Sequence, residues 1–303
     1  MDKELLKEKL AGKIPAENIV EDAPMAQETT FRCGGSAALF VTTDSVDDLR
    51  YALSVIRAFG AKWMILGNGS NVLFKDSGYD GVVIKLGKDF SGVAVDGCKV
   101  YAGAAALLSF VSKLAASKGL TGLEFASGIP GSLGGGVYMN AGAYGGSISD
   151  CIVSVIAVTP DGEIYKYEKD ELELSYRHSR FMDSGEIIID AEFELKEGDP
   201  EAIQETMADL ARRRKEKQPL SFPSAGSFFK RPEGYFAAAL IDQAGLKGLS
   251  VGDAQVSELH AGFIVNKGNA TASEVLELAS EVSRTVKEKY GVELEPEVRI
   301  VGD

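Results

Sequence analysis

The segment from residue 127 to residue 146 reads SGIPGSLGGGVYMNAGAYGG, and eight of its residues are glycine. Proteins average about 7% glycine, so this density needs a structural reason. Glycine is used where the backbone takes positive φ, or where another group must touch the main chain. The interleaved apolar residues can be buried and no collagen-like period exists, which argues against a linker. The segment therefore predicts backbone wrapped around a bound group, with N–H donors facing phosphate oxygens, as in a nucleotide site.

The composition defines the broad class. A length of 303 residues suggests about two domains, and 45% hydrophobic with 25% charged residues is typical of a soluble globular protein. The net charge of −13 argues against a nucleic-acid partner, although a few local basic side chains can still bind a phosphorylated ligand. Cys33, Cys98 and Cys151 form no close pair, which suggests a reducing compartment.

The N-terminal residues 1–15 have the pattern of an amphipathic helix and lack the apolar core of a signal peptide. No apolar stretch approaches the length that spans a bilayer, so we expect a cytoplasmic protein without a membrane partner.

Hydrophobic spacing predicts the main helices and strands, and a change in the sequence pattern predicts a domain boundary near residue 198. Residues 1 to about 30 are interpreted as a helical lead-in and a loop. Ser45 and Asp48 resemble a capping box at the start of a helix, and Asp161-Gly162 is a hairpin signal. We expect helices over 45–59, 107–116, 200–217, 235–244 and 271–290, and strands over 82–86, 152–159, 164–167, 187–195, 263–266 and 298–301.

The familiar nucleotide fingerprints are absent from the sequence. There is no P-loop and no G-x-G-x-x-G, because Gly67-Asn68-Gly69 is followed by Val72 where a third glycine belongs. The run GNGSN (67–71) follows an apolar stretch, so it is either a phosphate turn or a plain strand-to-loop turn. Together with the glycine segment, it favours a site for the two phosphates of a dinucleotide.

Metal and nucleophile chemistry have little support. His178 and His260 are the only histidines and are far apart, with no cysteine at ligand spacing, so we interpret both as structural and predict no metal site. No G-x-S-x-G or Cys-His nucleophile motif occurs.

Three short segments combine polar groups with apolar neighbours: YRHSRF (176–181), AGSFFKRP (225–232) and LEPEVRI (294–300). In isolation each has a structural reading, with Ser227 as a turn residue, Arg177 as a solvated or paired charge, and Glu297 as the start of an edge strand.

Taken in order, GNGSN, the glycine segment and these three motifs resemble the UDP-N-acetylenolpyruvoylglucosamine reductase family from about Thr30 onward. The resemblance implies an α+β fold, with a split FAD-binding region of the vanillyl-alcohol oxidase type followed by a smaller α+β substrate domain. It divides the chain into a lead-in (1–29), an FAD-binding domain in two parts split near residue 80 (30–198), and a substrate-binding domain (199–303). It also implies a peptidoglycan-precursor enzyme, a UDP-N-acetylmuramate dehydrogenase, that reduces the enolpyruvyl ether to the lactyl ether with NADPH through noncovalent FAD.

The resemblance assigns three catalytic roles. Hydride from flavin N5 adds to the enol carbon, and Arg177 faces the substrate carboxylate, which a guanidinium binds with two parallel hydrogen bonds. Glu297 stabilises the developing enediolate, which requires its protonated form. Ser227 donates the proton to the intermediate.

The resemblance also assigns contacts. In AGSFFKRP, Arg231 replaces an asparagine that several family members place on the substrate diphosphate, and arginine also binds phosphate. Arg214 and Lys217 are three residues apart and therefore share a helix face. The expected substrate contacts are Tyr176, Lys217, Lys230 and Arg231; the expected cofactor contacts are Gly67, Asn68, Gly69, Ser70, Asn71, Gly128, Ile129, Gly131, Ser132, Gly134, Asn140, Ala141 and Arg214.

Two alternatives remain open: an FAD-dependent sugar or alcohol oxidase of the same fold, and a non-catalytic nucleotide-binding protein. The chain length favours the shorter family subtype, which lacks an extra tyrosine loop over the substrate. Since NADPH and the UDP-sugar must both reach flavin N5, we expect them to share one pocket in turn.

Overall fold

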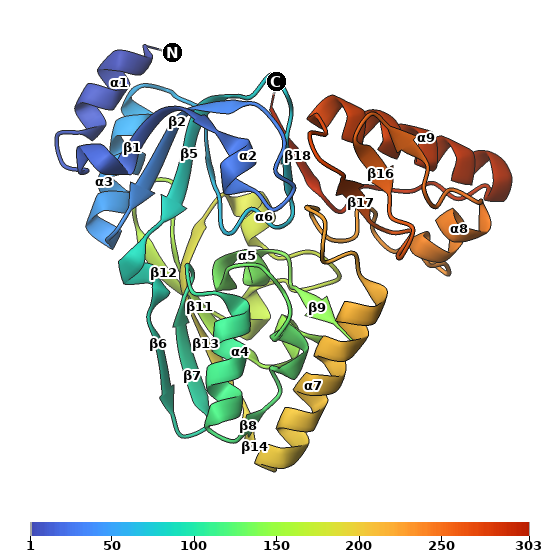
Figure 1. Cartoon of the computed structure of the whole chain (residues 1–303). Helices are drawn as coiled ribbons and strands as arrows, with labels where there is room; N and C mark the ends of the chain where they lie inside the picture. The colour runs from blue at the N-terminus through green and yellow to red at the C-terminus, as the bar shows by residue number, and fades with distance from the viewer. Residues whose placement is uncertain (1, 303) are drawn as a thin grey trace. The chain divides into compact units, whose positions relative to one another are not determined.

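The structure is a computed structural model that describes residues 2–302, and Figure 1 labels its helices and strands. Contacts within the chain divide it into two compact units, each made of segments that are discontinuous in sequence. The first unit comprises residues up to Glu21, Leu39–Asn68 and Gly81–Arg213; the second comprises Asp22–Ala38, Gly69–Asp80 and residues from Arg214 onward.

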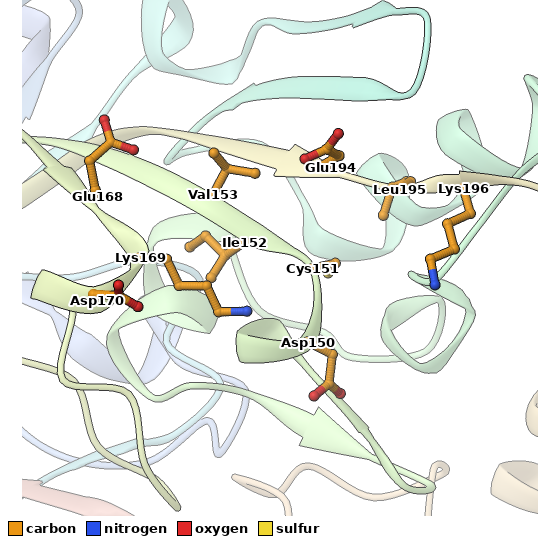
Figure 2. Close-up of a pocket in the computed structure, with 10 residues that line it drawn as sticks. All are labelled: Asp150, Cys151, Ile152, Val153, Glu168, Lys169, Asp170, Glu194, Leu195 and Lys196. Atoms are coloured by element: carbon orange, nitrogen blue, oxygen red, sulfur yellow. The ribbon is translucent and has the colours of Figure 1, made fainter.

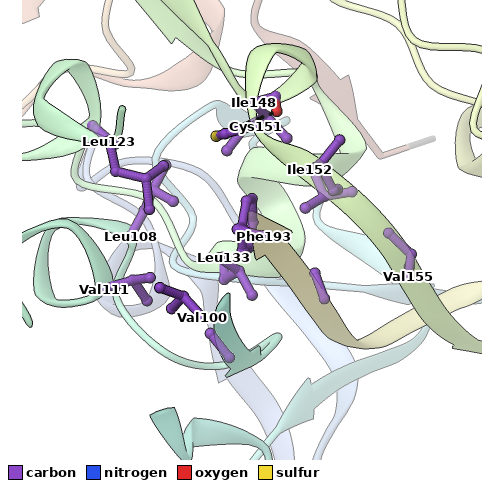
Figure 3. Close-up of a cluster of buried hydrophobic side chains, with 14 of the residues drawn as sticks. Val100, Leu108, Val111, Leu123, Leu133, Ile148, Cys151, Ile152, Val155 and Phe193 are labelled. Atoms are coloured by element: carbon purple, nitrogen blue, oxygen red, sulfur yellow. Dashed lines mark hydrogen bonds between the residues drawn. The ribbon is translucent and has the colours of Figure 1, made fainter. Parts of the chain in front are cut away.

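The largest sheet of the first unit is antiparallel and has the order β12-β11-β13-β7-β6. Apolar side chains of this sheet pack with two helices, α4 and α5, and Figure 3 shows Val100, Leu133, Val155 and Phe193 in that core. Small residues at the interface let α5 approach the sheet closely. The bounds are β6 Val93–Asp96, β7 Lys99–Gly103, β11 Ile152–Val158, β12 Ile164–Glu168, β13 Ile187–Glu194, α4 Leu108–Ser117 and α5 Leu133–Tyr138.

A second sheet has the order β1-β2-β5-β3, and a separate buried cluster joins it to two helices of the first unit, α1 and α3. Leu6 and Leu10 from α1 are fully buried in this cluster with Leu49 from α3. The bounds are α1 Lys3–Leu10, β1 Ile19–Pro24, β2 Ser36–Thr43, α3 Val46–Ala58, β3 Trp63–Ile65 and β5 Tyr79–Leu86.

The second unit is built on a small antiparallel sheet, β15-β16-β17, covered by α9. Phe228, Val275 and Val282 are buried in its core. The bounds are α8 Ala237–Gln243, β15 Ser250–Val251, β16 Ala254–Val256, β17 Ile264–Asn266 and α9 Ala272–Tyr290. A terminal strand, β18 (Arg299–Val301), pairs in parallel with β4 (Val72–Phe74).

The N-terminus of α9 explains why a segment near residue 76 belongs to this unit. Thr271 and Glu274 form a reciprocal capping box, and the carboxylate of Asp76 accepts hydrogen bonds from the N–H groups of Ala272 (2.9 Å) and Ser273 (2.8 Å). A carboxylate is favourable there because the first turn of a helix leaves N–H donors unpaired and carries partial positive charge.

Most long periodic segments were predicted correctly. Helices α3, α4, α7 (Pro200–Lys217), α8 and α9 are confirmed, as are β5, the β11–β12 hairpin, β13, β17 and β18. The loop expected before residue 30 is wrong in part, because Ile19–Pro24 forms β1. Only Ile19 and Ala23 of that strand are buried, so its sequence carries little of the alternation that identifies a half-buried strand.

The two units do not coincide with the domain boundary expected near residue 198. Helix α7 runs without interruption from Pro200 to Lys217, and the contact boundary lies inside it, after Arg213. The units describe packing, whereas the expected domains describe function, so the functional division stays a prediction. Within residues 2–302, no helix is both long enough and apolar enough to cross a membrane.

Candidate active site

In the first unit, the two segments predicted to bind phosphates contact each other. A Cβ atom built on Gly67 would lie 2.3 Å from Ser132 Oγ, so only glycine fits beside this hydroxyl. The side-chain amide of Asn68 donates a hydrogen bond to the Pro130 carbonyl. The structure thus places the start of GNGSN against the glycine segment, as a shared site requires.

Several N–H groups of these two segments form no hydrogen bond within the described part of the chain. Ser132 caps α5 by accepting from Gly135 N (3.3 Å), and the N–H groups of Leu133 and Gly134 donate to the carbonyls of Ala106 and Ala104. Over residues 2–302, by contrast, no hydrogen bond takes its N–H from residues 68–70, 131 or 132.

The donors of Asn68, Gly131 and Ser132 belong to the first unit and those of Gly69 and Ser70 to the second, and the donors of Gly131 and Ser132 come before α5 rather than from its first turn. Gly131 and Ser132 are buried, and a buried N–H without a partner costs free energy unless a ligand or water satisfies it. The donors therefore fit a diphosphate ligand, and Gly134 contributes close packing instead of a donor.

In the second unit, the rest of GNGSN is fixed by its neighbours. Gly69 has φ +60°, and a Cβ there would lie 2.1 Å from the Glu28 carbonyl oxygen. Thr30 N donates to Gly69 O (3.1 Å), and Asn71 Nδ2 donates to the carbonyl of Glu297 (3.1 Å). Asn71 therefore links this bend to the segment just before β18, which carries the predicted catalytic residue Glu297.

Two predicted cofactor contacts in the glycine segment are committed to protein hydrogen bonds. Asn140 is 7% exposed with φ +41°, and its Oδ1 accepts from Ser149 N (3.0 Å) while its Nδ2 donates to Ser175 O (2.9 Å). Ala141 N donates to Gly136 O at 2.7 Å. At the other end of the segment, Gly128 is exposed and Ile129 N donates to Ala126 O at 3.0 Å.

Arg177 lies in the first unit at the tip of a tight turn. Ser175 and His178 exchange two backbone hydrogen bonds of 3.2 Å, which leaves Tyr176 and Arg177 between them. Arg177 has φ +55°, a left-handed conformation that costs roughly 1–2 kcal/mol for a residue other than glycine. Its guanidinium lies 5.1 Å from the ring centre of Tyr176, which is 56% exposed, and donates to Gly142 O at 3.4 Å.

A buried polar cluster lies directly after the turn. The guanidinium of Arg180 lies 4.0 Å from the ring centre of Tyr167, and its Nε lies 3.5 Å from the buried carboxylate of Glu186. The hydroxyl of Tyr167 donates to the same carboxylate. Burial and the bond to Glu186 raise the pKa of Tyr167 to about 12, so the phenol stays protonated. Sequence reasoning missed this cluster, because only Arg180 lies in a motif.

In the second unit, Ser227 and Glu297 come together on hydrogen-bonded backbone. The carbonyl of Phe228 accepts from the N–H groups of Glu297 (2.8 Å) and Val298 (3.4 Å), and Phe228 N donates to Gly262 O (2.8 Å). Both side chains are half-buried, and the hydroxyl of Ser227 forms no hydrogen bond within the described part of the chain. The structure therefore places these two predicted catalytic residues in one region, although 70 positions separate them.

The basic residues differ in how far they are already paired. Arg212 and Arg213 both contact Asp209 at 2.6 Å, whereas no ion pair within residues 2–302 uses Arg214 or Lys217 in the last turn of α7. Lys230 Nζ lies 3.3 Å from Glu295, and the Arg231 guanidinium lies 3.9 Å from the Phe236 ring centre. Among the four basic residues predicted as contacts, Arg214 and Lys217 are therefore the ones that no ion pair or ring contact within residues 2–302 occupies.

Other candidate sites are weaker. Figure 2 shows a hollow of the first unit lined by Asp150, Glu168, Lys169 and Lys196 among others, and it contains none of the predicted site residues. Burial raises the pKa of its Cys151 to about 12, so this thiol is poorly reactive. His260 Nδ1 accepts from Gly262 N (3.2 Å), and residues 2–302 contain no group of three His, Cys, Asp or Glu that could hold a metal.

Comparison with known proteins identifies the family. Residues 37–168 match the family described as FAD binding domain, and residues 218–301 match UDP-N-acetylenolpyruvoylglucosamine reductase, C-terminal domain. The UDP-N-acetylenolpyruvoylglucosamine reductase of Clostridium novyi is 50% identical over 298 residues, which cover 98% of this chain and 97% of the relative. The chain belongs to the UDP-N-acetylenolpyruvoylglucosamine reductase family. A second reductase, from Agathobacter rectalis, is 47% identical over 303 aligned positions and 96% of each chain.

Solved structures agree with this family and with the expected fold class. The crystal structure of the reductase from Thermus caldophilus has a TM-score of 0.81 and 39% identity, covering 94% of this chain and 98% of its own. Phl p 4, described as a glucose dehydrogenase, has a TM-score of 0.50 at 13% identity over 64% of this chain, a likeness of fold alone. The predicted α+β fold with an FAD-binding region of the vanillyl-alcohol oxidase type is confirmed.

Proposed function

We propose that this family member reduces the enolpyruvyl ether of UDP-N-acetylglucosamine to UDP-N-acetylmuramate, with NADPH as the electron donor and noncovalent FAD as the cofactor. The observation that carries the proposal is the bond from Glu297 N to the carbonyl of Phe228, the residue after Ser227. It brings into one region of the second unit a carboxyl and a hydroxyl that has no hydrogen bond within residues 2–302. When bound, FAD supplies the hydride.

The chain's own residues supply binding and proton transfer. Arg177 binds the substrate carboxylate through its planar guanidinium, and Glu297 hydrogen-bonds the same group as negative charge develops on it. Ser227 holds the transferred proton at its Oγ, which forms no hydrogen bond within residues 2–302. That Arg177 meets the same substrate as Ser227 and Glu297 is part of this proposal.

The proposed contacts with phosphate rest on the N–H groups that form no hydrogen bond within residues 2–302. The N–H groups of residues 68–70, 131 and 132 would hold the FAD diphosphate, with Gly128 allowing close approach and Arg214 adding charge. Gly67 and Gly134 allow the close packing against Ser132 and Ala104 that places these segments. Lys217, Lys230, Arg231 and Tyr176 would contact the UDP-sugar. Arg231 replaces asparagine in this role, and its stacking on Phe236 would fix the direction of its guanidinium.

The wider setting is also proposed. We place the enzyme in the cytoplasm, in peptidoglycan precursor synthesis, with small-molecule substrates and with no nucleic-acid or membrane partner. Residues 30–198 would form the FAD-binding domain and residues 199–303 the substrate-binding domain of a short-subtype enzyme. If NADPH and the UDP-sugar use one pocket in turn, initial-rate plots give parallel double-reciprocal lines, and intersecting lines contradict the shared pocket.

Replacing Ser227 tests the chemical assignment. Ser227→Ala should slow product formation by about 10²–10⁴-fold, the range for a lost general acid, while NADPH still reduces the flavin at nearly the wild-type rate. Rapid mixing under anaerobic conditions measures the two half-reactions separately. Ser221→Ala, an exposed serine in the same segment, is the matched control. Normal turnover by Ser227→Ala would contradict the role of Ser227.

A further inference from the structure

The turn that carries Arg177 and the glycine segment are joined by two reciprocal side-chain hydrogen bonds. Asn140, in the glycine segment, donates through Nδ2 to the carbonyl of Ser175 at 2.9 Å. Ser179, at the base of the turn, donates through Oγ to the carbonyl of Tyr138 at 2.7 Å. Each motif therefore supplies one side-chain donor to the main chain of the other, and all four residues lie in the first unit.

Both donors are held in a single orientation. Ser179 is fully buried and Asn140 is 7% exposed, so neither can exchange its partner for bulk water. Ser149 N donates to Asn140 Oδ1 at 3.0 Å, which directs the amide nitrogen toward Ser175. A buried group that loses such a partner stays unsatisfied, so both bonds resist opening.

The turn needs this support because its tip is strained. Two backbone hydrogen bonds between Ser175 and His178 close the turn around its two central residues, and Arg177 has φ +55°. A non-glycine residue keeps such a conformation only where the surroundings enforce it. The two reciprocal bonds act on either side of the tip, at Ser175 before it and at Ser179 after it.

We propose that Asn140 and Ser179 are positioning residues, which fix the Arg177 guanidinium relative to the glycine segment that binds FAD. The inference rests on the proposed function for its consequence in catalysis, and on the contacts alone for its consequence in structure. Asn140 then acts through the turn, a role different from the direct cofactor contact that its motif suggests. Loss of either bond lets the guanidinium move, and a displacement of about 1 Å can cost about 10²-fold in rate.

Ser112 provides a matched control within the same core. Its hydroxyl is also buried (2% exposed) and also donates to a backbone carbonyl, that of Leu123, at 2.7 Å, but it lies on α4 and does not contact the turn. Ser179→Ala and Ser112→Ala remove the same chemical group and the same kind of bond. Asn140→Asp is a second variant, which keeps the acceptor for Ser149 and loses the donor to Ser175.

The test uses the FAD-loaded enzyme and two measurements. Hydrogen exchange should show faster exchange at the N–H groups of Ser175 and His178 in Ser179→Ala and Asn140→Asp, with wild-type protection there in Ser112→Ala. Rapid-mixing kinetics should show that reoxidation of the reduced flavin by the enolpyruvyl substrate becomes about 10- to 100-fold less efficient in the first two variants, with a raised KM. In Ser179→Ala, reduction by NADPH should change by no more than about twofold.

Equal effects of Ser179→Ala and Ser112→Ala on turn protection and on reoxidation would overturn the inference, because both serines would then serve only the core. Unchanged protection of the turn in both Ser179→Ala and Asn140→Asp would also overturn it. If wild-type reduced flavin fails to react with the enolpyruvyl substrate, the proposed function is wrong, and the exchange measurement still decides whether the two side chains fix the turn.

Discussion

Arg177 in the first unit and the Ser227–Glu297 pair in the second unit are held by different kinds of interaction. The Arg177 turn depends on side chains, since Asn140 and Ser179 supply its links to the glycine segment. Ser227 and Glu297 depend on main-chain bonds, which run from Glu297 N to Phe228 O and from Phe228 N to Gly262 O.

This difference determines which mutations can disturb each region. A main-chain bond survives most substitutions because every residue except proline keeps its N–H. A side-chain bond is lost with one residue. The Arg177 turn of the first unit should therefore be sensitive to neighbouring substitutions, and the Ser227–Glu297 region of the second unit should tolerate them.

The largest effect should come from the strained residue itself. Arg177→Gly removes the guanidinium and relieves the positive φ, so kcat/KM for the enolpyruvyl substrate should fall by about 10³-fold while Tm does not fall. Arg177→Lys, which keeps the charge but loses the paired donors, should lie between this variant and wild type. Steady-state kinetics and thermal unfolding measure the two effects. Arg284→Ala removes an exposed, ion-paired arginine of α9 and serves as the control.

A Tm of Arg177→Gly well below that of wild type would show that the guanidinium contributes more to folding than its strain costs. Full activity of Arg177→Gly would show that Arg177 does not bind the substrate.

A double-mutant cycle tests the contact between Gly67 and Ser132, where the two segments predicted to bind phosphates meet. Gly67→Ala should cost about 1–3 kcal/mol of stability, because its Cβ would lie 2.3 Å from Ser132 Oγ. Ser132→Ala should cost about 1 kcal/mol through loss of the α5 cap. The double variant should be more stable than the sum predicts, since the new Cβ then lies 3.5 Å from the Cβ of residue 132. Denaturant unfolding measures the cycle, and strict additivity would refute the clash.

A smaller effect concerns pH and the outer face of the main sheet in the first unit. Burial and the nearby charge of Glu192 raise the pKa of Asp190 from 3.8 to about 6. The folded state therefore binds this proton more tightly than the unfolded state, and the associated stability is lost as pH rises from 3.8 to about 6. Asp190→Asn should be more stable than wild type above this range and gain nothing below it.

Glu192→Gln is a control of opposite sign. A hydrogen bond from Lys99 lowers the pKa of Glu192, so its charge stabilises the fold above its unfolded pKa, and that contribution disappears as pH falls. Its replacement should reduce Tm at neutral pH and leave Tm unchanged in acid. Thermal unfolding across pH measures both variants, and a pH-independent difference for Asp190→Asn would contradict the raised pKa.

The smallest effect should occur in the second unit. Glu295→Gln removes the exposed ion pair with Lys230 but leaves the backbone bond from Lys230 N to Glu295 O (2.8 Å). Because exposed ion pairs contribute about 0–1 kcal/mol, stability and kcat should change little, with kcat within about twofold of wild type. Steady-state kinetics measures kcat, and a tenfold loss of kcat in Glu295→Gln would mean that side chains also fix this region.

Strong local signals explain what the sequence could predict of the fold. Ser45 and Thr271 accept hydrogen bonds at helix starts as their patterns indicate, and the apolar spacing behind them defines α3 and α9. The strands β1 and β2 were not recognised, because the buried positions of β1 are few and those of β2 follow no strict alternation. Membership of Asp76 in the second unit rests on its bonds to α9, which no local pattern reveals.

The site shows a similar limit. The motifs predicted Ser227 and Glu297 as catalytic residues, and this assignment stays a prediction; the structure adds that Glu297 N donates to the carbonyl of Phe228, next to Ser227. Gly134 N donates a hydrogen bond to Ala104 O, and the side-chain amide of Asn140 donates one to Ser175 O. The sequence could not show these bonds, because both acceptors lie in other segments of the chain. Ser179 stood inside a recognised motif, yet only the fold reveals its bond to Tyr138.

As a member of its family, this chain passes electrons from NADPH to an enolpyruvyl ether through a bound flavin. The most direct measurement is an anaerobic titration of the purified, FAD-loaded protein, followed by absorbance and by mass analysis of the product. The account predicts that NADPH bleaches the flavin, that the enolpyruvyl UDP-sugar restores its colour, and that one UDP-N-acetylmuramate forms per flavin. A flavin that NADPH leaves oxidised, or that only a sugar or alcohol reduces and only oxygen reoxidises, would contradict the account.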